Sequence, residues 1–107
     1  MTDTRTAILI SNPNAGRGGR RRAREVARFR EALAARGVRV EVWNTRARGD
    51  ATRLASEAAR AAHEIIVSGG DGTINEALQG LTGAGARLAI WPAGTANVLA
   101  RHLRLPF

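Results

Sequence analysis

Four short apolar segments alternate along the chain with longer stretches whose apolar residues follow a helical period. Residues 7–11, 38–43, 64–68 and 87–91 are rich in Val, Ile, Leu and Ala, so each is predicted to be a β-strand. The segment 38–43 alternates apolar and polar residues, whereas 64–68 is apolar at three consecutive positions. A strand of the latter kind is expected to be covered on both faces of its sheet.

The first helical stretch covers residues 20–36. Val26, Phe29 and Leu33 recur there at positions i, i+3 and i+7 and define one apolar face. Gly37 follows at the place where a glycine commonly ends a helix. This stretch is therefore predicted to be an amphipathic helix.

A second helix is predicted to begin at Asp50, whose carboxylate would act as its N-cap. Residues 73–81 and 95–103 are predicted to form two further helices. Gly80 and the two glycines that follow it are expected to loosen the chain before the fourth strand. The apolar face of the second helix is formed by Leu54, Ala55, Ala58 and Ala62.

This alternation of strands and helices predicts one α/β domain with an open, mostly parallel sheet and helices on both faces. A length of 107 residues suits a single domain of this kind. In such sheets the ligand site lies beyond the carboxyl ends of the strands. The turn-rich segments 12–19, 44–49, 69–73 and 92–95 follow the four predicted strands, so they are expected to converge at one edge.

The segment Gly69-Gly70-Asp71-Gly72-Thr73 carries the clearest chemical signal. Glycines allow backbone N–H groups to approach a ligand closely, and a following helix N-terminus attracts phosphate. A carboxylate at that place repels phosphate unless it holds Mg²⁺ or accepts a proton from a hydroxyl. The alternative is a tight strand-to-helix turn in which Asp71 caps the helix. The segment matches neither the P-loop pattern nor the GxGxxG dinucleotide pattern.

Composition excludes several classes of protein. The chain has no cysteine, which rules out a disulfide framework and a cysteine-ligated zinc site, and its two histidines lie far apart. No apolar run approaches the ~20 residues of a membrane span, and residues 1–6 lack the apolar stretch of a secretory signal. A cytoplasmic location is therefore expected.

The net charge of +8 has two explanations. All 17 basic residues are arginine, as a GC-rich genome would favour, but the charge also suits a face that binds nucleic acid or an anionic membrane. Aromatic residues make up 4% of the chain, which weighs against stacking on nucleic-acid bases. Trp43 and Trp91 end predicted strands and are assigned to packing.

A cluster of arginines follows the first glycine-rich loop. Either it is a solvated helix start, or some of its members reach nucleotide phosphates or anionic lipid headgroups. We favour attraction to an anionic surface for the group as a whole. The cluster comprises Arg17, Arg20, Arg21, Arg22 and Arg24.

Three motifs occur in order: Asn12-Pro13-x-x-Gly16, Gly69-Gly70-Asp71-Gly72-Thr73-x-Asn75-Glu76 and Pro92-x-Gly94-Thr95-x-Asn97. Together they resemble the catalytic domain of the diacylglycerol kinase family, which includes bacterial lipid kinases, sphingosine kinases and ceramide kinases. The resemblance extends over residues 8–106. The GGDGT element is shared with NAD kinase and phosphofructokinase relatives, whereas the Asn75-Glu76 extension and the third motif favour lipid kinases.

The resemblance implies ATP as phosphoryl donor, Mg²⁺ as cofactor and a membrane lipid hydroxyl as acceptor. Asp71 is then the expected catalytic residue and metal ligand. Thr45 and Thr95 match threonines of the family's nucleotide site, although they could instead be a loop hydroxyl and a helix N-cap. The expected nucleotide-binding residues are Asn12, Pro13, Asn14, Ala15, Gly16, Thr45, Gly69, Gly70, Asp71, Gly72, Thr73, Ile74, Asn75, Gly94 and Thr95.

Members of this family usually continue into a second, β-rich domain that completes the nucleotide cleft. Residues 1–107 would therefore be the nucleotide-binding domain without that second domain, weak or inactive alone, and prone to self-association through exposed apolar surface. The expected location is cytoplasmic and peripheral to the membrane. The expected partners are a membrane lipid substrate and an anionic membrane surface, and no nucleic acid is expected to bind. The alternatives are a kinase for a soluble hydroxyl, resembling NAD kinase, and a basic nucleic-acid-binding module.

Overall fold

The computed structural model describes residues 5–14, 19–62 and 64–92, which form a parallel sheet with helices on both faces. This confirms the predicted fold class. The described elements are β1 (Arg5–Ser11), α1 (Gly19–Ala34), β2 (Val38–Asn44), α2 (Asp50–Ala61), β3 (Glu64–Gly69), α3 (Asp71–Gly80) and β4 (Arg87–Pro92).

The strand order of the sheet is β2-β1-β3-β4, and every neighbouring pair is parallel. Leu9 of β1 pairs with Val42 on one side and with Ile66 on the other. The chain runs from β1 outward to β2 and then returns to β3 on the opposite side of β1. The point where the strand order reverses therefore lies between β1 and β3, which is where sheets of this type bind ligands.

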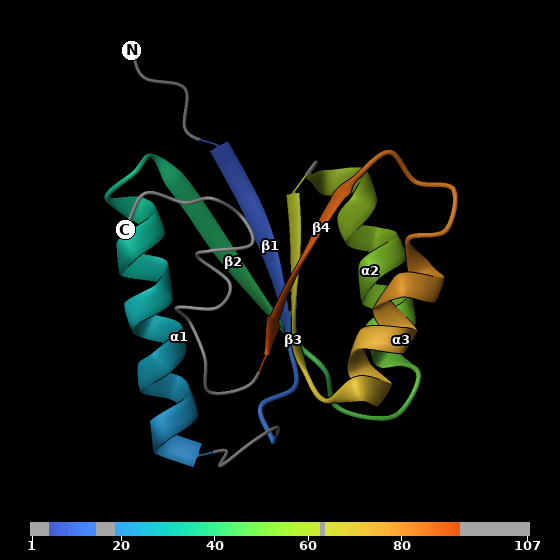
Figure 1. The fold of residues 1–107 in the computed structure, drawn as a ribbon, viewed down its shortest axis with the longest axis horizontal. Coiled ribbons are helices and arrows are strands. Elements are labelled where there is room, and N and C mark those ends of the chain that lie inside the picture. The colour runs from blue at the N-terminus through green and yellow to red at the C-terminus, as the bar shows by residue number, and fades with distance from the viewer. Residues whose placement is uncertain (1–4, 15–18, 63, 93–107) are drawn as a thin grey trace.

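Each face of the sheet packs against its own helical layer (Figure 1), with α1 on one side and α2 with α3 on the other. Alternate residues of a strand point to opposite faces. Leu9 therefore joins the cluster that contains Phe29 and Leu33 of α1, whereas Ile8 and Ile10 join the cluster that contains α2 and α3.

The two tryptophans pack in the interior, as predicted. Trp91 is fully buried and stacks on Phe29 of α1, with ring centroids 4.4 Å apart and an interplanar angle of 28°. Trp43 is partly buried against the α2–α3 layer.

Helices α2 and α3 approach closely at Gly80. A Cβ atom at this position would lie 2.2 Å from the backbone carbonyl oxygen of Thr52. The Thr52 hydroxyl also donates a hydrogen bond of 2.8 Å to the carbonyl oxygen of Glu76. Gly80 was expected to loosen the chain. It instead ends α3 at a place where only glycine fits without a shift of backbone.

The start of α2 corrects another prediction. Its N-cap residue is Gly49, with φ of 92°, and Asp50 is the first helical residue. The Asp50 carboxylate binds backbone N–H groups of the preceding loop and makes no N-cap hydrogen bond to the helix. Helix α3 begins at Asp71, two residues before its predicted start, and the helix predicted at 95–103 lies outside the described residues.

Within the described ranges, no helix is long and apolar enough to cross a membrane.

Candidate functional site

Loops from three strands meet in one cavity at the carboxyl edge of the sheet. Its volume is about 300 Å³. Five residues predicted for the site line it, although they follow β1, β2 and β3 and are far apart in sequence. The lining consists of Asn12, Asn14, Thr45, Arg46, Ala47, Arg48, Gly72, Thr73 and Glu76.

The loop after β1 is fixed by the backbone and side chain of Asn12. Its N–H donates to the Ser68 carbonyl oxygen at 3.0 Å, which ties this loop to β3. Its Oδ1 accepts the N–H of Asn14 at 3.0 Å, an Asx turn. Pro13 is half-buried beside it, and Ala15 and Gly16 lie outside the described residues.

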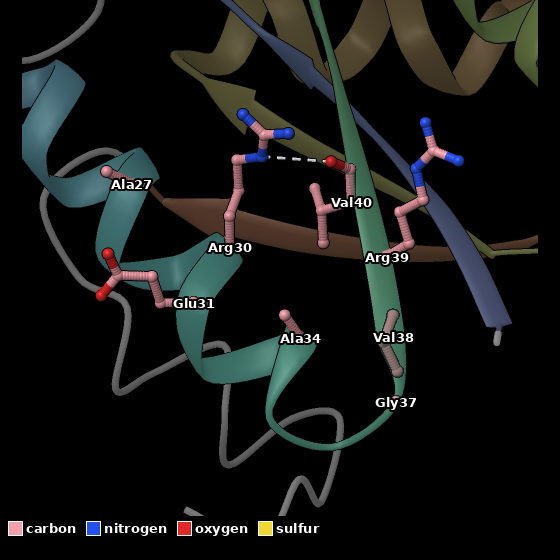
Figure 2. A pocket seen from close by; sticks show the side chains of 8 residues that line it. All are labelled: Ala27, Arg30, Glu31, Ala34, Gly37, Val38, Arg39 and Val40. Carbon is pink, nitrogen blue, oxygen red and sulfur yellow. Dashed lines mark hydrogen bonds between the residues drawn. The ribbon is translucent and has the colours of Figure 1, made fainter. Parts of the chain in front are cut away.

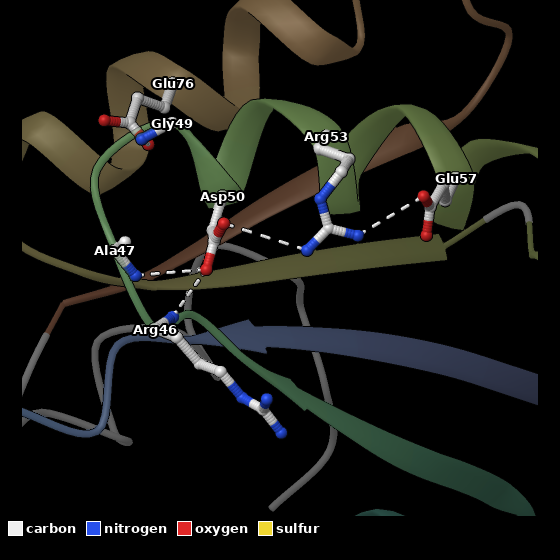
Figure 3. A network of polar contacts seen from close by, with 7 residues as sticks. All are labelled: Arg46, Ala47, Gly49, Asp50, Arg53, Glu57 and Glu76. Carbon is white, nitrogen blue, oxygen red and sulfur yellow. Dashed lines mark hydrogen bonds and ion pairs between the residues drawn. The ribbon is translucent and has the colours of Figure 1, made fainter.

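The loop after β2 brings Thr45 to the cavity. The Thr45 N–H donates to the Ser11 carbonyl oxygen at 2.8 Å, so its backbone is tied to the end of β1. The Asp50 carboxylate then folds the rest of the loop, because its Oδ2 accepts the N–H groups of Arg46 at 2.7 Å and Ala47 at 3.0 Å (Figure 3). The Arg46 N–H lowers the pKa of Asp50 below its usual range, with smaller contributions from the Ala47 N–H and the Arg53 guanidinium.

Glu76 connects this loop to the helix that follows β3. Its Oε1 accepts the Gly49 N–H at 3.0 Å (Figure 3). Glu76 belongs to the GGDGT-x-Asn-Glu motif, but it was not among the predicted site residues. The sequence places it in the predicted helix 73–81, whereas its hydrogen bond to the loop after β2 depends on how α2 and α3 pack together.

The glycines after β3 differ in what they require. A Cβ at Gly69 would lie 2.8 Å from the Thr73 Cβ, so packing alone demands glycine there. At Gly70 and Gly72 an added Cβ would meet no atom of the described residues within 4 Å, and neither glycine has a positive φ. The fold itself gives no reason for glycine at these two positions.

Asp71 is exposed and is the first residue of α3. The N-cap residue is Gly70, and no side chain of the described residues makes a capping hydrogen bond at this end of α3, so the alternative in which Asp71 caps the helix is wrong. Asn75 is also exposed, whereas Ile74 is half-buried against the α2–α3 layer. None of these three residues lines the cavity, and their contact with nucleotide stays a prediction.

Two arginines add positive charge to the cavity. Arg46 and Arg48 line it together with Thr45, and both are exposed. Neither arginine was predicted for the site, although both lie beside Thr45 in the loop that follows a predicted strand. Gly94 and Thr95, predicted for the same edge, lie outside the described residues.

Arg22 corrects the interpretation of the arginine cluster as a surface feature. Arg20, Arg21 and Arg24 are exposed, as expected, but the Arg22 side chain is only 5% exposed. It turns inward from the first turn of α1 and binds the hydroxyl of Ser68.

A second cavity, of about 460 Å³, lies between α1 and β2 (Figure 2). It is lined by the C-terminal half of α1 and the amino end of β2, away from the loops at the carboxyl edge. Arg30 Nε donates there to the Val40 carbonyl oxygen at 3.1 Å, which covers part of an edge strand. This cavity gathers no residue of the three motifs and carries no functional assignment.

Comparison with known proteins decides the family. A family model described as the diacylglycerol kinase catalytic domain matches residues 6–107. The chain belongs to this family. The resemblance inferred from the three motifs is thereby confirmed.

Relatives within the diacylglycerol kinase family are similar over nearly the whole chain. A diacylglycerol kinase of Bacillus subtilis is 38% identical over 105 residues, which cover 94% of this chain and 33% of that protein. A Pseudomonas aeruginosa protein named "Probable lipid kinase YegS-like" is 39% identical over 109 residues, covering 99% of this chain and 34% of that protein. The chain thus spans about a third of the length of these curated relatives.

Solved structures agree with this family membership. The crystal structure of a diacylglycerol kinase from Bacillus anthracis superposes with a TM-score of 0.72 at 36% identity, covering 99% of this chain and 39% of the other. The fold built from the described residues is therefore that of a known kinase domain.

Membership in a kinase family implies ATP and a divalent metal. The described residues suit a metal that is held partly by phosphates, but not one held by protein side chains alone. They contain no cluster of three or more His, Cys, Asp or Glu side chains that could form an all-protein metal site. Mg²⁺ commonly binds through one or two carboxylates together with phosphates and water. An exposed Asp71 beside open glycines suits this second arrangement.

Proposed function

We propose that this chain binds ATP with Mg²⁺ at the carboxyl edge of β1, β2 and β3, as the nucleotide-binding domain of a lipid kinase. The kinase would transfer the γ-phosphate to a hydroxyl of diacylglycerol or a related lipid. The observation that carries the proposal is the free space at Gly70 and Gly72. Glycines that the fold does not need, at the start of a helix, leave room for phosphate groups against backbone N–H donors.

Several side chains would act on the nucleotide. Arg46 and Arg48 would offset the negative charge of the phosphates, and Thr45 would offer a hydroxyl. Asp71 would hold Mg²⁺ jointly with phosphate oxygens, and the metal would neutralise charge that develops during transfer. Binding in this way positions the γ-phosphate for in-line attack. None of the described residues is assigned as the base that takes the proton of the lipid hydroxyl.

A pair of valine substitutions tests the binding site. Gly70 has φ of −83° and ψ of −176°, an extended conformation that valine adopts readily. Gly70→Val should therefore leave thermal stability nearly unchanged while weakening Mg-ATP binding about tenfold or more, because the side chain occupies the phosphate space. Gly85→Val is the matched control, since Gly85 also has open space and no positive φ but lies before the amino end of β4, beside Glu64 and Arg87. Calorimetric titration of both folded variants is the measurement, and equal affinities would overturn the site.

Asp71→Asn tests the metal in the same titration. It keeps the size of the side chain and removes the charge. We expect an unchanged thermal midpoint and a loss of the Mg²⁺ dependence of ATP affinity. If the Mg²⁺ dependence persists in full, Asp71 does not hold the metal.

The class of acceptor is tested by following the label. With γ-labelled ATP and diacylglycerol vesicles, a lipid kinase places label in the organic extract, whereas a kinase for a soluble hydroxyl places it in the aqueous product. The exposed arginines Arg20, Arg21 and Arg24 at the start of α1 support attraction to an anionic lipid surface. Leu78 and Ile90, exposed by 46% and 38%, support self-association through apolar surface.

A further inference from the structure

The guanidinium of Arg22 joins two strand ends in the interior. Its Nη2 donates to the Ser11 hydroxyl at 3.0 Å and also to the Ser68 hydroxyl. Both serines are almost fully buried, with exposures of 1% and 0%, and they are partners in the register of β1 and β3. One nitrogen thus uses its two hydrogens to bridge neighbouring strands.

The bridge lies at the reversal of strand order. Ser11 is the last residue of β1 and precedes Asn12, while Ser68 precedes Gly69 and Gly70. The chain leaves β1 toward α1 on one face and leaves β3 toward α3 on the other. Arg22 therefore bridges β1 and β3 at the point from which the two following glycine-rich segments lead to opposite faces of the sheet.

Burying the Arg22 guanidinium here carries a desolvation penalty. Removing its charge from water is unfavourable, and apolar residues of similar volume are often as stabilising. Burial lowers the pKa of Arg22, against an opposing effect of Glu25, yet an arginine stays charged at neutral pH. Its Nε and Nη1 have no hydrogen-bond partner among the described residues, although Nη1 lies 3.9 Å from Glu25 Oε2.

Contact with Trp91 offsets part of this cost. The Arg22 Cζ lies 5.0 Å from the centroid of the Trp91 ring, a cation–π arrangement. Trp91 is in turn stacked on Phe29. The guanidinium plane is thus held in place by an aromatic pair, and its position relative to the strand ends is fixed.

We propose that Arg22 is a positioning residue for the nucleotide phosphates. By bridging Ser11 and Ser68 it sets the spacing of the loops that begin at Asn12 and Gly69, and it places a fixed positive charge behind them. The inference rests on the proposed nucleotide site. It predicts that loss of Arg22 lowers ligand affinity by a factor that grows with the number of phosphates on the ligand.

Arg22→Met tests this prediction, because methionine fills the space of the stem without charge or donors. ATP affinity should fall about tenfold or more, ADP affinity less, and adenosine affinity by no more than about twofold. Arg22→Lys should recover part of the loss, since it restores the charge and a donor but not the planar fork. Arg28→Met is the control, as Arg28 is exposed on the same helix and outside the cavity.

Two results would overturn the positioning role. A folded Arg22→Met chain that binds ATP as the wild type does would show that Arg22 is dispensable. An equal loss for ATP, ADP and adenosine would show a general structural effect. If Arg22→Met does not fold, Ser68→Ala removes one acceptor instead and is judged by the same ligand series.

Amide hydrogen exchange separates this inference from the proposed function. Ser68→Ala should speed exchange of the Asn12 and Thr45 amides, which bond across the strand ends, about fivefold or more, whereas Ser56→Ala on the exposed side of α2 should not. Unchanged exchange would overturn the bridge even if nucleotide binds. A wild-type chain that binds no nucleotide would overturn the proposed function and the phosphate role with it, whatever the exchange shows.

Discussion

The two ends of α3 use glycine for opposite reasons. At its C-terminus, Gly80 is demanded by the chain itself, because the Thr52 carbonyl oxygen occupies the place of a Cβ atom. At its N-terminus, an added Cβ at Gly70 or Gly72 would meet none of the described atoms within 4 Å. The first end is closed by packing against α2, and the second end is open toward the cavity.

The difference separates a glycine that serves folding from one that serves a ligand. The sequence does not distinguish the two kinds of glycine, because Gly70, Gly72 and Gly80 all lie in glycine-rich segments. Substitutions at the closed end should change stability first, and those at the open end should change nucleotide affinity first.

The largest effect is expected from an alanine at each end of the helix. Alanine favours a helix over glycine by about 1 kcal/mol. Gly80→Ala must overcome a Cβ contact of 2.2 Å with Thr52 backbone, so we expect a net loss of about 1–3 kcal/mol in unfolding free energy. Gly72→Ala, on the same helix, should not lower stability but should weaken nucleotide binding. Denaturant unfolding and nucleotide titration give the two quantities.

This pair is informative because the expected signs differ. A Gly80→Ala chain as stable as the wild type would mean that α2 and α3 separate easily. A Gly72→Ala chain that loses stability but binds nucleotide normally would mean that the open end also serves folding.

A smaller effect is expected at Glu76, which touches both regions. Glu76→Ala removes the acceptor of the Gly49 N–H and should lower stability by about 1 kcal/mol while loosening the loop that carries Thr45. Glu76→Gln keeps an acceptor oxygen and removes a negative charge from the cavity, so stability and nucleotide affinity should be retained. Equal losses in the two variants would show that charge, and not the hydrogen bond, holds the loop.

Sequence reasoning predicted the elements and the edge at which the site lies. Short apolar runs, the alternation in 38–43 and the helical stretches between them predicted each described strand and helix to within about two residues. The rule that ligands bind beyond the carboxyl ends of the strands brought together Asn12, Thr45 and Thr73. These inferences succeeded because local periodicity and chain topology determine them.

The features that depend on contacts between distant segments were not predictable. Arg22 is one of several arginines near the start of α1, and only the facing serines of β1 and β3 distinguish it. Asp50 has the composition of an N-cap, but the path of the preceding loop offers its carboxylate two other N–H donors. Gly80 depends on the crossing of α2 and α3, which no single segment encodes.

The smallest effect is expected from Asp50, whose carboxylate folds the loop after β2. The pKa of Asp50 is lowered in the folded chain, mainly by the Arg46 N–H. Its contribution to stability is therefore full above the unfolded value of about 4 and is lost as the pH falls through the lower folded value. The difference in thermal midpoint between wild type and Asp50→Asn should be largest near neutral pH and shrink below about pH 4. Glu57→Gln, which also removes a partner of Arg53 but leaves the loop untouched, is the control. A difference that stays constant or grows on acidification would show that ionised Asp50 does not hold this loop, which the hydrogen bonds of Thr45 to Ser11 and of Gly49 to Glu76 would then hold.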